Sequence, residues 1–199
     1  MQRRRSFDDF SEEEQLEQYL EGINRYIANK KEHMFSASGL DYAIASTVRM
    51  MSFCQKTAKI VLENKDIDEH PLNDKKCMDA FHSMTARNVK ADFVIINNNL
   101  YQDDLNEKIS EFYAGRKDMV TVGTIEPSVA KDLSKNLEKP NKWYHPDYNY
   151  SYILFDDNFF IKIRKNSSSV GMNVKDFNRD YSRLFDAYQN KSRPWQMKL

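Results

Sequence analysis

The residues from 148 to 195 constrain the fold of this chain more than any other segment. Two apolar runs, 150–155 and 159–163, stand on either side of Asp156-Asp157-Asn158. Turn-forming residues between two such runs predict a β-hairpin. A polar stretch at 166–169 then predicts a loop. A helix with one apolar face should follow, because apolar residues recur there at helical spacing, namely Phe177, Tyr181, Leu184, Phe185 and Tyr188.

Upstream of this segment, strand patterns alternate with helix patterns. We expect strands at 58–62, 89–96 and 119–122 and helices at 75–87, 103–113 and 126–137. The run Phe93-Val94-Ile95-Ile96 is apolar on both faces, as is typical of a strand in the middle of a parallel sheet. Alternation of this kind predicts an α/β fold, with a mixed, mainly parallel sheet and helices on both faces.

The N-terminal part of the chain has a different pattern. Ser11-Glu12-Glu13-Glu14 is a capping box, so a helix should begin there and continue to about Lys31. A second helix should begin near Ser38, with an apolar stripe formed by Leu40, Ile44, Val48 and Met51. Together they predict a helical hairpin. We therefore divide the chain into a tail and amphipathic helix, 1–38, and an α/β domain, 39–199.

Composition excludes several classes of protein. The 30 basic and 30 acidic residues cancel, which argues against a protein that coats nucleic acid, although the residues from Asn158 onward carry a net charge of about +6. With two cysteines, four histidines and no C-x-x-C motif, we expect no metal site, and without a glycine-rich loop no nucleotide cofactor. Cys54 and Cys77 should be buried free thiols. No apolar run approaches the ~20 residues of a membrane span, so we expect a cytoplasmic protein.

Candidate binding residues fall into two groups. Ligands of such sheets bind beyond the carboxyl ends of the strands, where Asn97-Asn98-Asn99 follows the best predicted strand. A second group is basic and could bind a phosphate-bearing partner such as nucleic acid, unless it is simply a solvated surface. Its members are Lys162, Arg164 and Lys165 after the hairpin, and Arg179 and Arg183 one turn apart on the last helix.

The order of elements from about Leu40 to Trp195 resembles one phospholipase D-like half-domain. The closing helix and the Ser192-Arg193-Pro194-Trp195 that follows it are similar to the end of that family's fold. The family's signature is H-x-K-x-x-x-x-D, in which the His is the nucleophile and the Lys binds phosphate. Counting back from Asp156 places Asn149 and Ser151 at the His and Lys positions, and counting from Asp157 places Tyr150 and Tyr152 there. Neither register supplies an imidazole or a cation.

The resemblance therefore implies a catalytically degenerate module that works by binding. Members with one half-domain commonly pair, so it implies a homodimer, with the N-terminal helices setting assembly or the choice of a protein partner. Such domains occur as accessory or regulatory parts of larger systems, including defence systems on mobile elements.

The alternative is a divergent phosphodiesterase or nuclease. His145 is the best candidate for acid–base or nucleophilic chemistry because it lies in a loop next to the hairpin. It would act with Lys142 or Lys162 and with Asp156 or Asp157. A subunit that contacts only other proteins is a third hypothesis.

Overall fold

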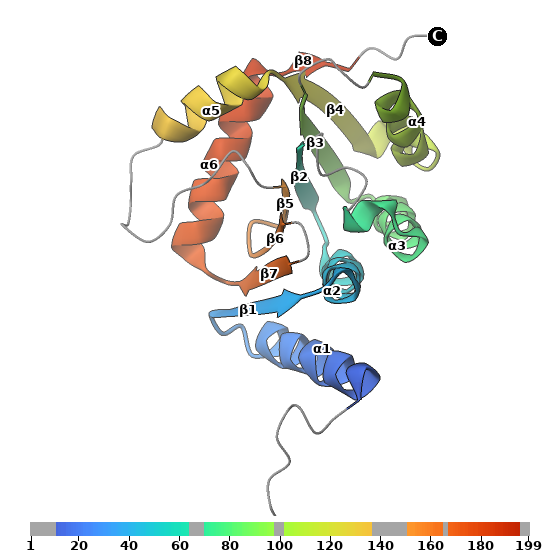
Figure 1. The fold of residues 1–199 in the computed structure, drawn as a ribbon, viewed down its shortest axis with the longest axis vertical. Helices are drawn as coiled ribbons and strands as arrows, with labels where there is room; N and C mark the ends of the chain where they lie inside the picture. The colour runs from blue at the N-terminus through green and yellow to red at the C-terminus, as the bar shows by residue number, and fades with distance from the viewer. Residues whose placement is uncertain (1–10, 64–69, 98–101, 137–150, 165–166, 196–199) are drawn as a thin grey trace, which may run out of the picture.

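The computed structural model describes residues 11–63, 70–97, 102–136, 151–164 and 167–195 (Figure 1). Within these ranges the helices are α1 (Glu12–Ala28), α2 (Leu40–Phe53), α3 (Lys75–Ala86), α4 (Gln102–Tyr113), α5 (Pro127–Asn136) and α6 (Lys175–Lys191). The strands are β1 (His33–Ser38), β2 (Thr57–Glu63), β3 (Lys90–Ile96), β4 (Val120–Ile125), β5 (Ser151–Phe155), β6 (Phe159–Arg164), β7 (Ser167–Met172) and β8 (Arg193–Pro194).

The strands of these ranges form one mixed sheet in the order β1-β7-β6-β5-β2-β3-β4-β8. The mixed α/β fold was predicted correctly, but the parallel part is smaller than expected. Only β2, β3 and β4 run parallel, whereas the other neighbouring pairs are antiparallel. The predicted hairpin is β5–β6. Its turn has left-handed φ angles of 52° at Asp156 and 57° at Asp157, and the Asn158 N–H donates to the Phe155 carbonyl at 3.0 Å, as in a type I′ turn.

Helices cover both faces of the sheet, as predicted. On one face, buried side chains of α2, α3 and α4 pack on the central strands, where Phe81, Phe93 and Phe112 form a ring cluster. On the other face, α6 lies over β5, β2 and β3, and its Tyr181 and Phe185 are buried there. Figure 1 shows α5 and α6 on one side of the strands and α2, α3 and α4 on the other.

Besides the two-residue β8, two strands of the described structure were not predicted. β1 lies between the helices of the expected helical hairpin, and β7 includes the serines that we had assigned to a loop. The two strands pair with each other, and the Ser36 and Ser169 hydroxyl oxygens are 3.3 Å apart. Serine has little intrinsic preference for strands, so the pairing across 133 residues determines this structure rather than local sequence.

The apolar stripe of α2 also differs from the prediction. Of the four expected residues only Met51 is buried, and Leu40 is 48% exposed. The helix instead buries a neighbouring face that contains Ala43, Met50 and two hydroxyl residues, Ser46 and Thr47. Both hydroxyls donate to backbone carbonyls one turn earlier, and the Ser46 hydroxyl is also within hydrogen-bond distance of the Tyr19 hydroxyl of α1, at 3.1 Å.

Cys54 and Cys77 are free and buried, as predicted. Burial raises the pKa of each thiol to about 12, and the Asp156 carboxylate adds to this effect at Cys54. Both thiols are therefore protonated at neutral pH and are poor nucleophiles. Among the described helices, none is long and apolar enough to cross a membrane.

Acid should destabilise the fold through His70. This histidine is buried, its Nδ1 accepts the Leu72 N–H at 3.2 Å, and burial lowers its pKa to about 3. Because the folded-state pKa lies below the unfolded value of about 6.5, the neutral form is favoured in the folded state. The stabilising contribution of neutral His70 is then fully present above pH 6.5. Below pH 6.5 the free energy of unfolding falls by about 1.4 kcal/mol per pH unit. Between pH 7 and pH 5 the loss in urea unfolding should be about 2 kcal/mol.

The variant His70→Asn tests this expectation, because asparagine can accept the same Leu72 N–H but does not titrate. Its free energy of unfolding should change less between pH 7 and pH 5 than that of the wild type. His82→Asn, at a half-exposed histidine on α3, should retain the wild-type pH dependence. Parallel pH profiles for the wild type and His70→Asn would contradict the assignment.

Candidate ligand-binding site

One part of the sheet carries polar side chains where a core residue would be expected. Side chains alternate between the faces of a strand, so the register of β1, β7 and β6 shows which residues share the α6 face. Met34, Gly171 and Phe160 form an apolar row there. The next residues with described side chains along the same three strands are all polar, and we call them the serine–lysine surface: Ser36 and Ser38 of β1, Ser169 of β7 and Lys162 of β6.

The serine–lysine surface is accessible. Ser36 and Ser38 are exposed, and Ser169 and Lys162 are intermediate in exposure. Hydroxyl groups and an ammonium group are hydrogen-bond donors, and donors of this kind bind phosphate and carboxylate oxygens. The surface can therefore hold an anion. Sequence reasoning found its cation, Lys162, but not its serines, and the available signal was the period-two spacing of Ser36 with Ser38.

The surface lies toward the carboxyl ends of the parallel strands, where ligands of such sheets bind. β6 ends there, and β5 begins there beside the end of β2. Asn97 follows β3 at the same end, but it is 4% exposed and its N–H donates to the Ile125 carbonyl at 3.0 Å. Of the predicted asparagines, Asn97 is therefore part of the fold, and Asn98 and Asn99 lie outside the described residues.

The residues at the position of the family's lysine are both buried. Ser151 is fully buried, and its hydroxyl accepts the Glu63 N–H at 3.0 Å. In the other register the residue is Tyr152, which is buried beneath α6 and donates to the Tyr181 carbonyl at 3.3 Å. Burial raises the pKa of Tyr152, so its hydroxyl stays protonated. Neither residue offers a cation to a phosphate.

The Asp156 carboxylate is engaged by the backbone of the α2–β2 connection. It accepts the N–H groups of Gln55 and Lys56, each at 2.7 Å, and that of Thr57 at 2.9 Å. Phe155 pairs with Ala58 at the start of β2, so this contact lies at the opposite end of the sheet from Asn97. The Asp156 carboxylate therefore joins the hairpin turn to a segment that lies 100 residues away in the sequence.

The predicted catalytic residues are therefore not gathered in one place by the described structure. Asp157 is exposed at the hairpin turn, where it accepts from the Ser182 hydroxyl at 3.1 Å and lies 3.8 Å from the Lys59 ammonium. Lys162 lies farther along β6, on the serine–lysine surface. His145 and Lys142 fall outside the described residues, as does the predicted cation Lys165.

The two arginines of α6 are exposed but differ in their surroundings. Arg179 forms ion pairs with Asp176 at 3.2 Å and Asp180 at 3.3 Å, which offset much of its charge. Arg183 makes no ion pair with any residue that the structure describes. The predicted basic group is thus divided between one face of β6, with Lys162, and the outer surface of α6, and the side chain of Arg164 lies outside the described part of the structure.

Comparisons with known proteins bear on the fold. No family model and no curated protein sequence matches the chain. Among solved structures, Nuc, a phospholipase D family member from Salmonella typhimurium, superposes with a TM-score of 0.57 and 10% identity, covering 83% of this chain and 99% of that one. NucT from Helicobacter pylori gives a TM-score of 0.53 and 12% identity over the same shares of the two chains.

A third similar structure is the archaeal chromatin protein TrmBL2, which shows a novel mode of DNA binding. It has a TM-score of 0.50 and 12% identity, over 92% of this chain and 63% of that one. The chain therefore has a phospholipase D-like fold, as the resemblance in the sequence implied. At these identities the comparisons establish the fold alone.

Proposed function

We propose that this chain is a non-catalytic phospholipase D-like module that binds the phosphates of a nucleic acid and acts as an accessory subunit. The observation that carries the proposal is the burial of Ser151. In the register set by Asp156, this serine stands where the family's phosphate-binding lysine would be. Its hydroxyl accepts a hydrogen bond from the Glu63 N–H. Without a cation or an imidazole at the signature positions, the family's covalent mechanism lacks both of its reacting groups.

The serine–lysine surface supports the choice of ligand. Its hydroxyls and its Lys162 ammonium suit phosphate oxygens, which receive many of the hydrogen bonds in protein–nucleic acid complexes. Lys162 and Ser169 lie in the part of the chain with a net positive charge, which allows local attraction although the whole chain is neutral.

A binding experiment tests this proposal. Fluorescein-labelled 20-nucleotide DNA and RNA, single- and double-stranded, would be titrated with the chain and followed by anisotropy at 50 and 200 mM salt. We expect binding that weakens with salt. Lys162→Glu with Arg164→Glu should reduce the affinity at least tenfold.

The matched control is Lys90→Glu with Lys117→Glu. It reverses two exposed cations at the opposite end of the sheet, where β3 begins, and should have little effect. Equal losses in the two double variants would indicate attraction by total charge and would contradict a defined site. An absence of binding to every probe would favour a subunit that contacts only proteins.

The same probes separate this module from the enzyme alternative. Incubation with and without magnesium should leave all four nucleic acids intact. Cleavage that disappears in His145→Ala would show instead a divergent phosphodiesterase or nuclease.

The proposal includes pairing of two chains, as the resemblance implies. Light scattering coupled to size exclusion, at two salt concentrations, should show a stable dimer. A monomer would mean that a different protein supplies the second half-domain.

A further inference from the structure

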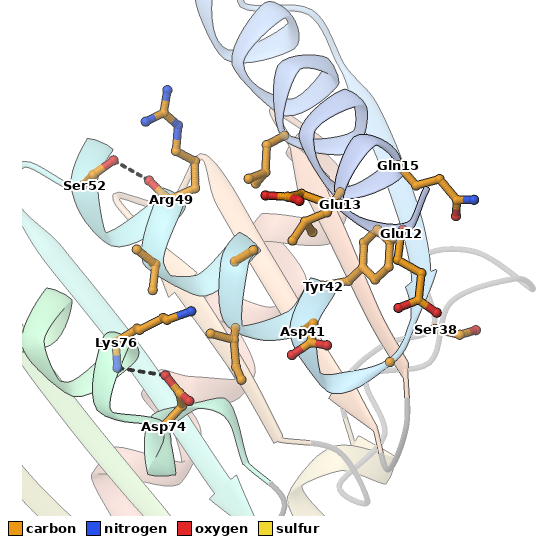
Figure 2. A pocket seen from close by; sticks show the side chains of 16 residues that line it. Glu12, Glu13, Gln15, Ser38, Asp41, Tyr42, Arg49, Ser52, Asp74 and Lys76 are labelled. Atoms are coloured by element: carbon orange, nitrogen blue, oxygen red, sulfur yellow. Dashed lines mark hydrogen bonds between the residues drawn. The ribbon is translucent and has the colours of Figure 1, made fainter. Parts of the chain in front are cut away.

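A groove of about 840 Å³ lies between α1 and α2 (Figure 2). Its floor is apolar, and its margin includes Asp74 and Lys76 at the start of α3. The side chains of the floor come from the two helices in turn: Leu16 and Leu20 from α1, and Ile44, Ala45 and Val48 from α2. The groove therefore joins three helices on the face of the sheet opposite the serine–lysine surface.

The apolar floor is left open because α2 buries a different face. Ala43, Met50 and Met51 enter the core, whereas Ile44 and Val48 stay only half-buried. The facing helix is also loosely packed. Within the 17 residues of α1, Ile23 is the single buried side chain. The two helices thus present apolar surface to each other without closing the space between them.

One end of the groove is acidic. Glu12 at the start of α1 and Asp41 at the start of α2 lie toward this end, and Glu13 lies farther along the groove in the direction of Arg49, as Figure 2 shows. All three are exposed, and none forms an ion pair with a described residue. The positive N-terminal ends of the two helices offset part of this charge, but a helix end carries only about half a charge.

The two cations that line the groove, Arg49 and Lys76, form no ion pair with these carboxylates in the described structure. The Arg49 Nε–H donates to the Asn24 side-chain oxygen at 2.6 Å, and its guanidinium lies 5.1 Å from the centre of the Phe53 ring. Figure 2 shows Arg49 and Ser52 at the end of the groove away from Glu12. Phosphate would be repelled from the acidic end, whereas lysine or arginine side chains would be attracted.

We propose that this groove binds an amphipathic helix of a partner protein, with an apolar stripe on the floor and basic residues at the acidic end. Helix-in-groove recognition uses apolar anchors at i, i+3, i+4 and i+7, which suit a floor built from two helices. The 14 residues of α2 span about 21 Å at 1.5 Å per residue, so the partner helix needs about four turns. The module would then hold nucleic acid on one face and a protein on the other.

The test uses two synthetic, fluorescein-labelled 16-residue peptides. Both have leucines at i, i+3, i+4 and i+7. In one peptide every charged residue is a lysine, and in the other every charged residue is a glutamate. Anisotropy with the full chain should show binding of the lysine peptide at least tenfold tighter than that of the glutamate peptide. Equal affinities would overturn the proposal.

Substitutions in the chain show whether the lysine peptide binds in this groove. The triple variant Glu12→Gln, Glu13→Gln and Asp41→Asn should weaken the lysine peptide at least fivefold, and Val48→Gln on the floor should do the same. The matched control is Glu17→Gln, Glu21→Gln and Glu107→Gln, which neutralises three exposed carboxylates that do not line the groove. The proposal would be overturned if the control lost as much affinity for the lysine peptide as the groove variants, or if neither groove variant lost any.

Three further outcomes concern the other occupants. Lys162→Glu with Arg164→Glu should leave peptide binding unchanged, which separates this groove from the proposed nucleic-acid site. A dimer that Val48→Gln converts to monomer would show that a second copy fills the groove. A tenfold gain in affinity on changing Arg3, Arg4 and Arg5 to glutamine would show that the chain's own basic terminus fills it. Either of the last two results would overturn the proposal.

Discussion

Replacing Gly171 with alanine should lower the free energy of unfolding by about 3 kcal/mol, near the upper end of the range for overpacking a core. A Cβ atom at this position on β7 would lie 2.5 Å from Cζ of the Phe160 ring and still closer to Cε1. The ring cannot move aside, because it is buried against α6. It stacks on Phe177, with ring centres 4.0 Å apart, and also on Tyr181. The added methyl group must therefore separate β6 from β7.

Urea unfolding followed by circular dichroism measures this effect. Gly115→Ala is the matched control, since its Cβ would lie at an ordinary 3.4 Å from the His82 ring, and its change should stay below about 1 kcal/mol. A second variant isolates the cause. Phe160→Leu should partly relieve Gly171→Ala, so that the double variant is more stable than the sum of the single changes implies. Strict additivity would show that the ring is not the obstacle.

Much of this fold could be predicted from local sequence. The hairpin was recognised because two short apolar runs stand on either side of a turn of aspartates, and α6 because its apolar residues keep a period of about 3.6. The buried strand β3 was recognised because it is apolar on both faces. These patterns arise within a few residues of one another, so a single sequence contains the whole signal.

The missing strands show where that approach fails. β1 and β7 contain five serines in twelve residues and have little local preference for strand structure. Each becomes a strand because the other pairs with it, and the chain contains no local mark of that pairing. The face of α2 was misassigned for a related reason. Besides Met50 and Met51, the helix buries Ala43, Ser46 and Thr47, whose burial depends on what packs against them rather than on their own hydropathy.

The candidate site was predicted in part. Lys162 was predicted as a candidate on the second strand of the hairpin, and the structure places it on the serine–lysine surface. The serines beside it come from β7 and β1, so they could not be placed before those strands were known. Arg179 was expected to be available to a ligand, but Asp176 and Asp180 of its own helix pair with it. Such pairs at short spacing were visible in the sequence.

Asp156→Asn should lower the free energy of unfolding by about 2 kcal/mol, since hydrogen bonds to charged groups contribute more than neutral ones. The Asp156 carboxylate holds three consecutive backbone N–H groups, from Gln55 to Thr57, and so ties the hairpin turn to the start of β2. Asparagine tolerates the left-handed φ of 52°, so the backbone should be retained. The change removes the charge and one of the two accepting oxygens, and urea unfolding measures the loss.

Asp157→Asn is the matched control. Asp157 has nearly the same backbone conformation, but it is exposed and its partners are side chains, so its removal should cost less than about 1 kcal/mol. The pair of variants also decides between the two roles considered for Asp156. A structural carboxylate predicts lower stability and unchanged nucleic-acid affinity under conditions in which both variants are folded. If Asp156→Asn instead retained wild-type stability and abolished a measurable cleavage of nucleic acid, Asp156 would be a catalytic residue, because its contacts with the α2–β2 connection would then contribute little to the fold.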